Sequence, residues 1–500
     1  MPIVNTTQVF TSNTTLDRDQ VWTFETGGYF EVDGCTLRIE GSVIAGYRTI
    51  FILKNGGKVT GLRRVCPEWW GAGSGAANNA PYIQAAINCM EDAFNTSSGP
   101  LELVLTGPYP VTEGVSLTPS SLNNLHVTGG GGGIVSRLIA KGSGWSAGQA
   151  VVTVKARNDV SKTSDFELRG FAIVNEGSTA RIGLQIGVET DDYDVQGQRL
   201  SLVEDVVIQD FPVGVLLQRA RLVKFHRLGV WLENQPNGVA VRVRVPAATI
   251  SRAEVGDSEF ENCEFAGPTY NAANSAYGVE TVIEASAIGG IQALRFDKCI
   301  FHKFNDAFHL ADGTSSTTQN GYRSNITDIW ITNCQMDGPC GRGVLLKSNG
   351  SSANPCWISN VHIFGCYFQG SALEFVKMES PNADDQVHLV KSVFVSNNWS
   401  NGGAKIFLDA YKAAGLTVTD NQISDLTWAS GPAIEFHTVQ NVVCTGNLMR
   451  RQSNETVQHM VQVDQPSDWY VIANNNSGGC ATAGAVNAAT GANRVVQLNI

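Results

Sequence analysis

One short phrase recurs along the second half of the chain: Phe296-Asp-Lys-Cys299, Ile331-Thr-Asn-Cys334, Ile363-Phe-Gly-Cys366, Val395-Ser-Asn-Asn398, Val418-Thr-Asp-Asn421 and Cys444-Thr-Gly-Asn447. Each copy is a short apolar alternation that ends in a polar turn. Counting Cys263 and Asn475, which close two further copies, the last residues lie 36, 35, 32, 32, 23, 26 and 28 positions apart. Repeats of this length are typical of solenoids and propellers, whose units bury their apolar faces on one another.

A second phrase follows the first in most repeats: Gly214-Val-Leu-Leu, Gly238-Val-Ala-Val, Gly278-Val-Glu-Thr, Gly343-Val-Leu-Leu, Ala372-Leu-Glu-Phe and Ala433-Ile-Glu-Phe. Two to three short strands per repeat, with no helix between them, are typical of a right-handed parallel β-helix. A propeller would need a stricter period of about 40 residues. At the repeated turn a buried cysteine acts as a small apolar filler. An asparagine there tolerates the left-handed backbone region, and its amide bonds to the rungs above and below.

These patterns predict an all-β chain in four parts. Residues 1–66 alternate apolar and polar side chains between turn glycines and predict a small N-terminal β element. Residues 67–100 hold a cap motif and one capping α-helix. The parallel β-helix solenoid occupies residues 101–475, and residues 476–500 form a C-terminal strand segment.

The capping helix is predicted at about residues 80–94. Pro81 suits the first helical position, and Asn79 or Ala80 is the expected N-cap. One apolar stripe recurs at helical spacing, consisting of Ile83, Ala86, Ile87, Met90 and Phe94. Such a helix would cover the open end of the solenoid core.

Composition excludes several classes of protein. The net charge is −11 and no run of lysine or arginine is present, which argues against a nucleic-acid partner. No apolar stretch approaches about 18 residues, so we expect no membrane insertion. The N-terminus lacks the pattern of a secretory signal peptide. The eleven cysteines form no CxxC pair, and we expect neither a cofactor nor a bound metal.

The block Pro67-Glu-Trp-Trp-Gly-Ala72, followed by Tyr82-Ile-Gln-Ala-Ala-Ile87 and the rung phrases, resembles the pectate-lyase-like superfamily, and in particular bacteriophage tailspike depolymerases. The resemblance extends over nearly the whole chain. One departure is Gly73-Ser-Gly-Ala-Ala-Asn-Asn79, which stands where the family often has an acidic Gly-Asp-Gly…Asp-Asp-Thr stretch. We interpret it as a change of loop and cap.

The resemblance implies a homotrimer that binds, and usually cleaves, bacterial surface polysaccharide such as capsule or O-antigen lipopolysaccharide. It also implies a place in the virion, on the phage tail, with action at the bacterial cell surface. The chain would be made in the host cytoplasm without a signal peptide. Residues 1–66 would provide attachment to a phage tail or baseplate protein.

Hydrolysis of a glycosidic bond needs two carboxylates that flank it. On a β-helix, outward residues of successive rungs form columns spaced by about 4.8 Å. The second phrase places Leu373, Phe375, Ile406, Leu408, Ile434 and Phe436 inward. We therefore predict an outward catalytic group on three successive rungs, consisting of Glu374, Asp409, Glu435 and His437.

Flanking residues complete this predicted site. Trp399, Tyr411 and Trp428 are expected on adjoining turns, where aromatic faces stack on sugar rings. Lys347 and Lys377 occupy equivalent places one or two rungs earlier and could neutralise an acidic glycan.

Other acidic groups are further candidate sites. A second candidate cluster consists of Asp297, His302, Asp306, His309 and Asp312 beside Tyr322. A third pairs Glu280 with Glu284, while Glu204 and Asp205 fit ordinary rung edges, and His226 and His362 fit surface positions.

Two alternative functions stay open at this point. A lyase acting on uronic-acid polymers needs a base beside a charge-neutralising group, and His437 with Lys377 or Lys347 could serve. The same body could also be a receptor-binding tail protein without catalysis.

Overall fold

The fold is a right-handed parallel β-helix, as predicted. The computed structural model describes residues 1–73, 75–93, 100–118, 125–155, 165–189, 195–247, 253–268, 275–284, 287, 289–311, 325–338, 341–351, 355–370, 373–384, 387–427, 431–450, 457–464, 466–478, 480, 485–487 and 494–496. The chain divides into two compact units. The first holds Met1–Phe211 with Leu222–Gly229, and the second holds Pro212–Arg221 with Val230–Ile500.

The first unit begins with a small β-helix of its own. Three parallel three-stranded sheets make it up: β1 (Ile3–Val4), β4 (Val21–Phe24) and β7 (Ser42–Ile44); β2 (Thr7–Phe10), β5 (Tyr29–Asp33) and β8 (Phe51–Lys54); β3 (Thr14–Leu16), β6 (Thr36–Ile39) and β9 (Lys58–Thr60). The sequence predicted strands here. It did not predict that they coil, because each strand is only two to five residues long.

Helix α1 (Ala80–Ala93) follows the predicted capping pattern. Ile83, Ala86, Ile87 and Met90 are at most 1% exposed. The helix contacts β9, β11 (Leu101–Leu105) and β13 (Val115–Leu117). Its predicted apolar stripe is therefore confirmed, except at residue 94, which lies outside the described residues.

The cap motif forms the 3-10 turn η1 (Pro67–Trp70) just before this helix. Trp69 and Trp70 are buried, and the indole nitrogen of Trp69 donates to the carbonyl of Gly46 over 2.8 Å. One carboxylate oxygen of Glu68 accepts a hydrogen bond from the Tyr109 hydroxyl at 2.5 Å. The motif thus joins the small β-helix to the first strands that follow.

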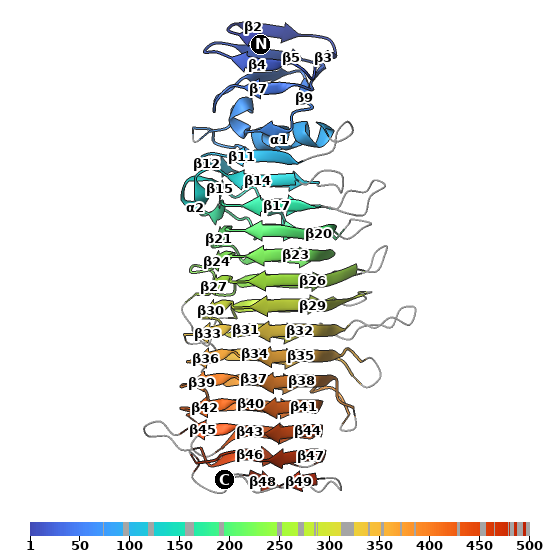
Figure 1. The fold of residues 1–500 in the computed structure, drawn as a ribbon, viewed down its shortest axis with the longest axis vertical. Helices are drawn as coiled ribbons and strands as arrows, with labels where there is room; N and C mark the ends of the chain where they lie inside the picture. Colours follow the sequence, from blue (N-terminus) through green and yellow to red (C-terminus); the bar gives the residue numbers. More distant parts are fainter. Residues whose placement is uncertain are drawn as a thin grey trace. The chain divides into compact units, whose positions relative to one another are not determined.

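The strands of the second unit lie in three parallel sheets (Figure 1). Within this unit, sheet 1 contains β26 (Ala253–Glu261), β29 (Gly289–Asp297), β32 (Ile326–Thr332), β35 (Ile358–Phe364), β38 (Val390–Ser396), β41 (Ala413–Thr419), β44 (Gln440–Thr445), β47 (Asp468–Ala473) and β49 (Arg494–Val496). Sheet 2 consists of β27 (Glu264–Ala266), β30 (Ile300–His302), β33 (Gln335–Asp337), β36 (Tyr367–Gln369), β39 (Trp399–Asn401), β42 (Gln422–Ser424) and β45 (Leu448–Arg450).

Sheet 3 carries the candidate site. It consists of β22 (Val213–Gln218), β25 (Val239–Val245), β28 (Tyr277–Ile283), β31 (Asp306–Ala311), β34 (Arg342–Lys347), β37 (Glu374–Glu379), β40 (Ile406–Tyr411), β43 (Pro432–His437), β46 (His459–Val463) and β48 (Ala485–Asn487). The last strands of sheets 1 and 3 belong to the predicted C-terminal segment, and they extend these sheets by parallel pairing.

At the repeated turn, side chains of successive rungs are hydrogen-bonded to one another. The side-chain amide of Asn398 donates to Asn421 at 3.0 Å, Asn421 to Asn447 at 2.8 Å, and Asn447 to Asn475 at 2.8 Å. This confirms the predicted amide ladder. The backbone prediction was wrong by one residue, because the left-handed conformation belongs to the preceding position, such as Asn397 (φ 54°). The column residue itself points inward and bonds between rungs.

The cysteine part of the same column is also inward. Its members, Cys263, Cys299, Cys334 and Cys366, are at most 1% exposed. All are free thiols. No helix in the described part of the chain is long and apolar enough to cross a membrane.

Candidate functional site

The predicted catalytic residues lie on the outer face of sheet 3. In β40, Phe407, Leu408 and Ala410 are fully buried, while Asp409 lies between them with a side chain 17% exposed. In β43, Ile434 and Phe436 are likewise buried around Glu435. The period-two alternation of these strands therefore turns the carboxylates outward, as predicted.

The register of the sheet changes the composition of the column. Lys377 pairs with Asp409, and Asp409 pairs with Glu435. Glu374 pairs instead with Ile406, so the prediction that it shares the column of Asp409 and Glu435 was wrong. Leu373-Glu-Phe and Val376-Lys-Met are both apolar-polar-apolar triplets, and a period-two pattern does not tell which of them aligns with the next rung.

Asp409 has an incomplete set of partners. Its Oδ2 accepts from the Lys377 ammonium at 3.1 Å, whereas Oδ1 is buried without a hydrogen-bond partner. Burial raises the pKa of Asp409 above its ordinary value, and the attraction of Lys377 offsets this only in part. Burial lowers the pKa of Lys377, but the charges of Asp409 and Glu374 outweigh that effect and raise it.

The next rung holds a chain of charge-assisted contacts. His437 Nε2 lies 3.2 Å from a Glu435 oxygen, and Nδ1 lies 2.9 Å from an oxygen of Asp464. The hydrogen bond to Glu435 raises the pKa of His437, so the imidazolium is favoured between two carboxylates. Sequence reasoning missed Asp464. The alternation of Val461-Gln-Val-Asp464, which continues the strand pattern for one more residue, was the signal.

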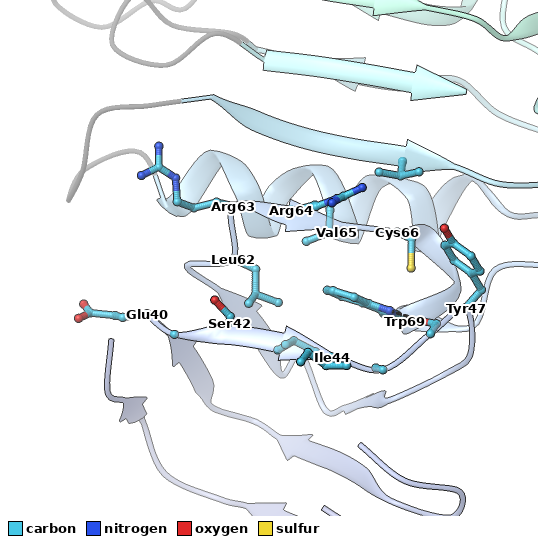
Figure 2. A pocket seen from close by; sticks show the side chains of 15 residues that line it. Glu40, Ser42, Ile44, Tyr47, Leu62, Arg63, Arg64, Val65, Cys66 and Trp69 are labelled. Atoms are coloured by element: carbon cyan, nitrogen blue, oxygen red, sulfur yellow. Dashed lines mark hydrogen bonds between the residues drawn. The ribbon is translucent and has the colours of Figure 1, made fainter. Parts of the chain in front are cut away.

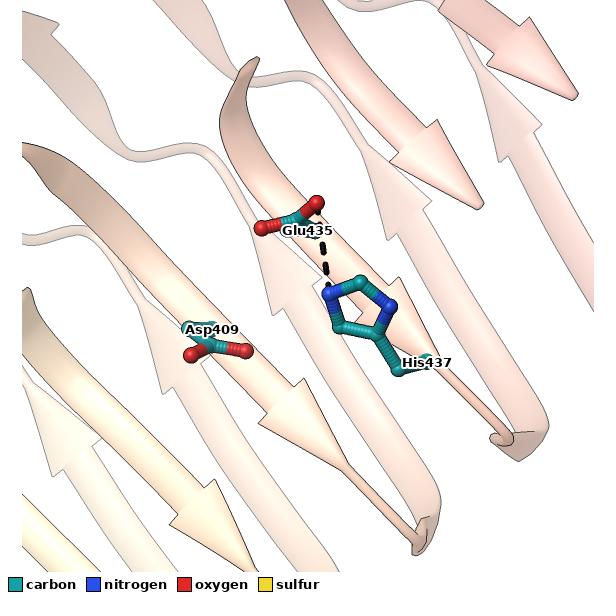
Figure 3. A group of neighbouring side chains, drawn as sticks. All are labelled: Asp409, Glu435 and His437. Carbon is teal, nitrogen blue, oxygen red and sulfur yellow. Dashed lines mark ion pairs between the residues drawn. The ribbon is translucent and has the colours of Figure 1, made fainter. Parts of the chain in front are cut away.

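Figure 3 shows Asp409, Glu435 and His437 gathered on two neighbouring strands. One oxygen or nitrogen of each lies within 4.8 Å of those of the other two. Among the described residues, these are the only three potential metal ligands this close together. Both imidazole nitrogens already contact carboxylates, and the Lys377 ammonium lies beside Asp409. The arrangement therefore suits proton transfer better than cation binding.

The predicted substrate-binding residues do not all lie on one face. Tyr411 ends β40 and pairs in register with Glu379 and His437, which brings it beside the carboxylates. Trp399 begins β39 in sheet 2, not on a flanking turn of the same face; it is 49% exposed and packs edge-on against Tyr367. Trp428 lies outside the described residues. Lys347 forms an ion pair with Glu379 at 2.9 Å.

The second predicted cluster divides among the three sheets. Asp297 lies in sheet 1 and His302 in sheet 2, whereas Asp306 and His309 lie on β31 in sheet 3. Asp312 and Tyr322 fall outside the described residues.

The part on sheet 3 gains two residues that the sequence did not suggest. Asp306 contacts His309 Nδ1 at 2.7 Å and Arg342 at 3.4 Å, and the ring of Tyr277 packs on His309 with centroids 4.3 Å apart. Arg342 also donates to Glu374 at 2.8 Å.

The remaining carboxylate candidates are ion-paired. The pairs are Glu280 with Arg242, Glu284 with Arg244, Glu204 with His226 and Arg227, and Asp205 with Arg227. His362 is stacked between Trp330 and Phe394, and burial lowers its pKa. These contacts agree with rung-edge and surface roles.

A cavity of about 530 Å³ lies in the first unit, between β7 and β10 (Arg64–Val65) (Figure 2). Leu62 and Trp69 line it, and Glu40 is its one carboxylate. Since hydrolysis needs a carboxylate pair, this cavity does not compete with the sheet 3 face as a candidate active site.

The comparisons with known proteins show similarity in fold and none in sequence family. No protein-family model matches the sequence, and no curated protein matches it. Among solved structures, a double mutant of the tailspike protein of E. coli bacteriophage HK620 in complex with a pentasaccharide is 10% identical, with 87% of this chain and 80% of that chain covered and a TM-score of 0.54.

Two further structures are similar. Another mutant of the same tailspike, in complex with a hexasaccharide, is 10% identical over 87% and 80% of the two chains, with a TM-score of 0.51. A family 28 exopolygalacturonase of Yersinia enterocolitica is 10% identical over 83% and 79%, with a TM-score of 0.45. The chain therefore shares its parallel β-helix fold with this phage tailspike.

Proposed function

We propose that this protein is a phage tailspike depolymerase that hydrolyses glycosidic bonds of a bacterial surface polysaccharide on the outer face of sheet 3. The observation that carries the proposal is the buried, unpartnered oxygen of Asp409 next to Glu435. Two neighbouring carboxyl groups whose surroundings differ are the usual basis for an acid and a base in glycosidases. The shared fold with saccharide-bound tailspikes supports the substrate class.

Asp409 is the general acid in this proposal. Burial raises its pKa and so favours its protonated form, which can donate the proton to the glycosidic oxygen as the bond to the anomeric carbon breaks. Glu435, ionised beside the imidazolium of His437, attacks the anomeric carbon. A water then releases the sugar, leaves its hydroxyl on that carbon and returns its proton through Asp409.

The separation of the pair favours retention of configuration. One oxygen of Asp409 and one of Glu435 lie within 4.8 Å. An inverting pair needs carboxyl groups about 6.5–9.5 Å apart to admit a water, whereas a retaining pair needs about 5–5.5 Å. We therefore assign Glu435 as the nucleophile.

Neighbouring residues have supporting roles in the proposal. Lys377 holds Asp409 in place through Oδ2, and Tyr411 offers a ring and a hydroxyl to a bound sugar. Asp464 and His437 position Glu435. Glu374 binds Arg342 and takes no part in the acid–base pair, and Trp399 belongs to another face.

Further proposals concern assembly. We propose a homotrimer that occupies the phage tail of the virion, with residues 1–66 bound to a tail or baseplate protein. A light-scattering mass of one chain would contradict the trimer.

The test is incubation with purified polysaccharides from a panel of bacteria, followed by mass spectrometry. Oligosaccharides one water heavier than the repeating unit, absent with the Glu435→Gln variant, are expected. Unsaturated products without that water would indicate a lyase instead. No product from a strain that the protein binds would indicate a receptor-binding tail protein.

A further inference from the structure

The charged side chains of sheet 3 bear on which glycan this face accepts. This inference rests on the proposed function. It concerns the strands β31, β34, β37, β40, β43 and β46, every residue of which is described. Their lysine and arginine side chains are Arg342, Lys347 and Lys377. Their carboxylates are Asp306, Glu374, Glu379, Asp409 and Glu435.

Each of these three cations already contacts a carboxylate of the protein. Arg342 lies 2.8 Å from Glu374, and Lys347 lies 2.9 Å from Glu379. Lys377 lies 3.1 Å from Asp409 and 3.7 Å from Glu374. Their side chains are between 21% and 35% exposed, so the pairs are partly shielded from water. A substrate carboxylate would have to displace one of these protein carboxylates to gain a cation.

The balance of charge on these strands also bears on an anionic substrate. With Asp409 protonated and His437 an imidazolium, as proposed above, four carboxylates face four cations, and the His437 cation is itself held by Glu435 and Asp464. Glycan carboxylates or phosphates placed along these strands would gain no unpaired cation and would meet a chain whose net charge is −11, which costs affinity and slows encounter. Hydroxyl and acetamido groups carry no such penalty, and they can bond to the outer oxygens of the same carboxylates.

We infer that the substrate is an uncharged polysaccharide, free of uronic acid, sialic acid and phosphate. This also bears on the lyase alternative. Proton removal beside a substrate carboxylate needs a cation to neutralise it, and the expected candidates, Lys347 and Lys377, are occupied. Lys405 is exposed and immediately precedes β40, so it is the lysine that could form an ion pair with an acidic glycan.

Binding tests this inference separately from catalysis. The Asp409→Asn chain would be titrated with acidic bacterial polysaccharides, with the same polymers after chemical reduction of their carboxyl groups, and with neutral polysaccharides. Because Asp409 is proposed to carry a proton, the substitution leaves the charge of the face unchanged. We expect carboxyl reduction to tighten binding by about tenfold at low salt, and binding of neutral polymers to be insensitive to salt.

The opposite result has a distinct signature. Tighter binding to the acidic polymer than to its reduced form, weakened by Lys405→Ala, would overturn the inference. The wild-type chain separates this from the proposed function. Cleavage of acidic polymers alone would leave hydrolysis standing and refute the neutral substrate. Binding of neutral polymers without cleavage by wild type would refute hydrolysis and leave the binding preference standing.

Discussion

Two clusters on the same face of sheet 3 each contain a buried aspartate, a histidine and a basic side chain, and they differ in how the aspartate is bonded. The Asp306 cluster consists of Tyr277, Asp306, His309, Arg342 and Glu374, and the Asp409 cluster consists of Lys377, Asp409, Glu435, His437 and Asp464. In the first, His309 binds one Asp306 oxygen and Arg342 binds the other. In the second, Asp409 has one oxygen on Lys377 and one without a partner.

This difference separates a structural carboxylate from a reactive one. Arg342 has a planar, forked guanidinium that reaches Asp306 and Glu374 together, which fills the bonding capacity of a buried site. The ammonium of Lys377 is a point charge and leaves Asp409 Oδ1 unbonded. A buried carboxylate that lacks a bond favours its protonated form, and that form is the one a general acid needs.

The largest expected effect is on catalysis in the Asp409 cluster. Asp409→Asn removes the proposed proton donor without changing the size of the side chain. We expect hydrolysis to fall by about 10²- to 10⁴-fold, because that is the usual contribution of a general acid. The initial rate of reducing-end release from a cleaved polysaccharide measures it.

Asp306→Asn is the matched control for this rate. It is the same substitution, made on a buried carboxylate of the same face, and we expect most of the activity to remain. If Asp306→Asn were the more damaging of the two, the assignment of the acid would move to the Asp306 cluster.

The second effect concerns stability, for which we expect Asp306→Asn to be the more damaging of the two substitutions. Asp306 has a side chain only 5% exposed and loses ion pairs with His309 and Arg342 when it becomes Asn. We expect the free energy of unfolding of the Asp306→Asn variant to fall by about 3 kcal/mol, since a buried pair is broken, His309 loses its carboxylate and Arg342 keeps only Glu374. Asp409→Asn should cost less than about 1 kcal/mol, because the amide replaces a group already inclined to be neutral. Denaturant unfolding of the two variants measures both, and equal losses would contradict the comparison.

The sequence predicted the rungs more reliably than it predicted the clusters. Apolar alternation and the column from Cys263 to Asn475 identified the solenoid, and helical spacing located α1 within a residue of its observed end. These features depend on local pattern and burial alone. The amide ladder was also predictable, because one side chain repeats at one turn.

The local sequence pattern did not determine the register between neighbouring strands. Glu374 was assigned to the wrong column because its strand contains two alternating triplets that are equivalent by polarity. Arg342, Tyr277 and Asp464 were missed because their partners are about 27 to 36 residues away in sequence and meet only when strands stack. The unpartnered oxygen of Asp409 follows from three-dimensional packing and has no signal in the sequence.

A third, smaller effect concerns the carboxylate beyond the histidine. Asp464→Asn removes one of the two carboxylates that hold His437 and leaves the Glu435 contact in place. We expect the rate to fall by about tenfold while substrate affinity holds, because residues that orient a catalytic group act with this size. Steady-state kinetics separate the two quantities. A change in affinity alone would make Asp464 a binding residue.

The smallest effect is a pH dependence of stability that the Asp409 cluster should show through His437. Its pKa in the folded chain is raised above the ordinary 6.5 by the hydrogen bond to Glu435. A raised pKa means that the folded chain binds the proton more tightly than the unfolded chain does. The stabilisation is therefore complete below pH 6.5 and is lost as the pH rises through the folded pKa. The raised pKa of Asp409 acts in the same direction, but the loss of stability that it causes starts near its ordinary pKa of 3.8, so the two groups act over different pH ranges.

We expect His437→Gln to flatten the fall in unfolding free energy above pH 6.5 and to leave the fall at acidic pH as in wild type. Urea unfolding at a series of pH values measures both limbs, and a variant that kept the same fall above neutrality would show that His437 does not hold an extra proton in the folded state.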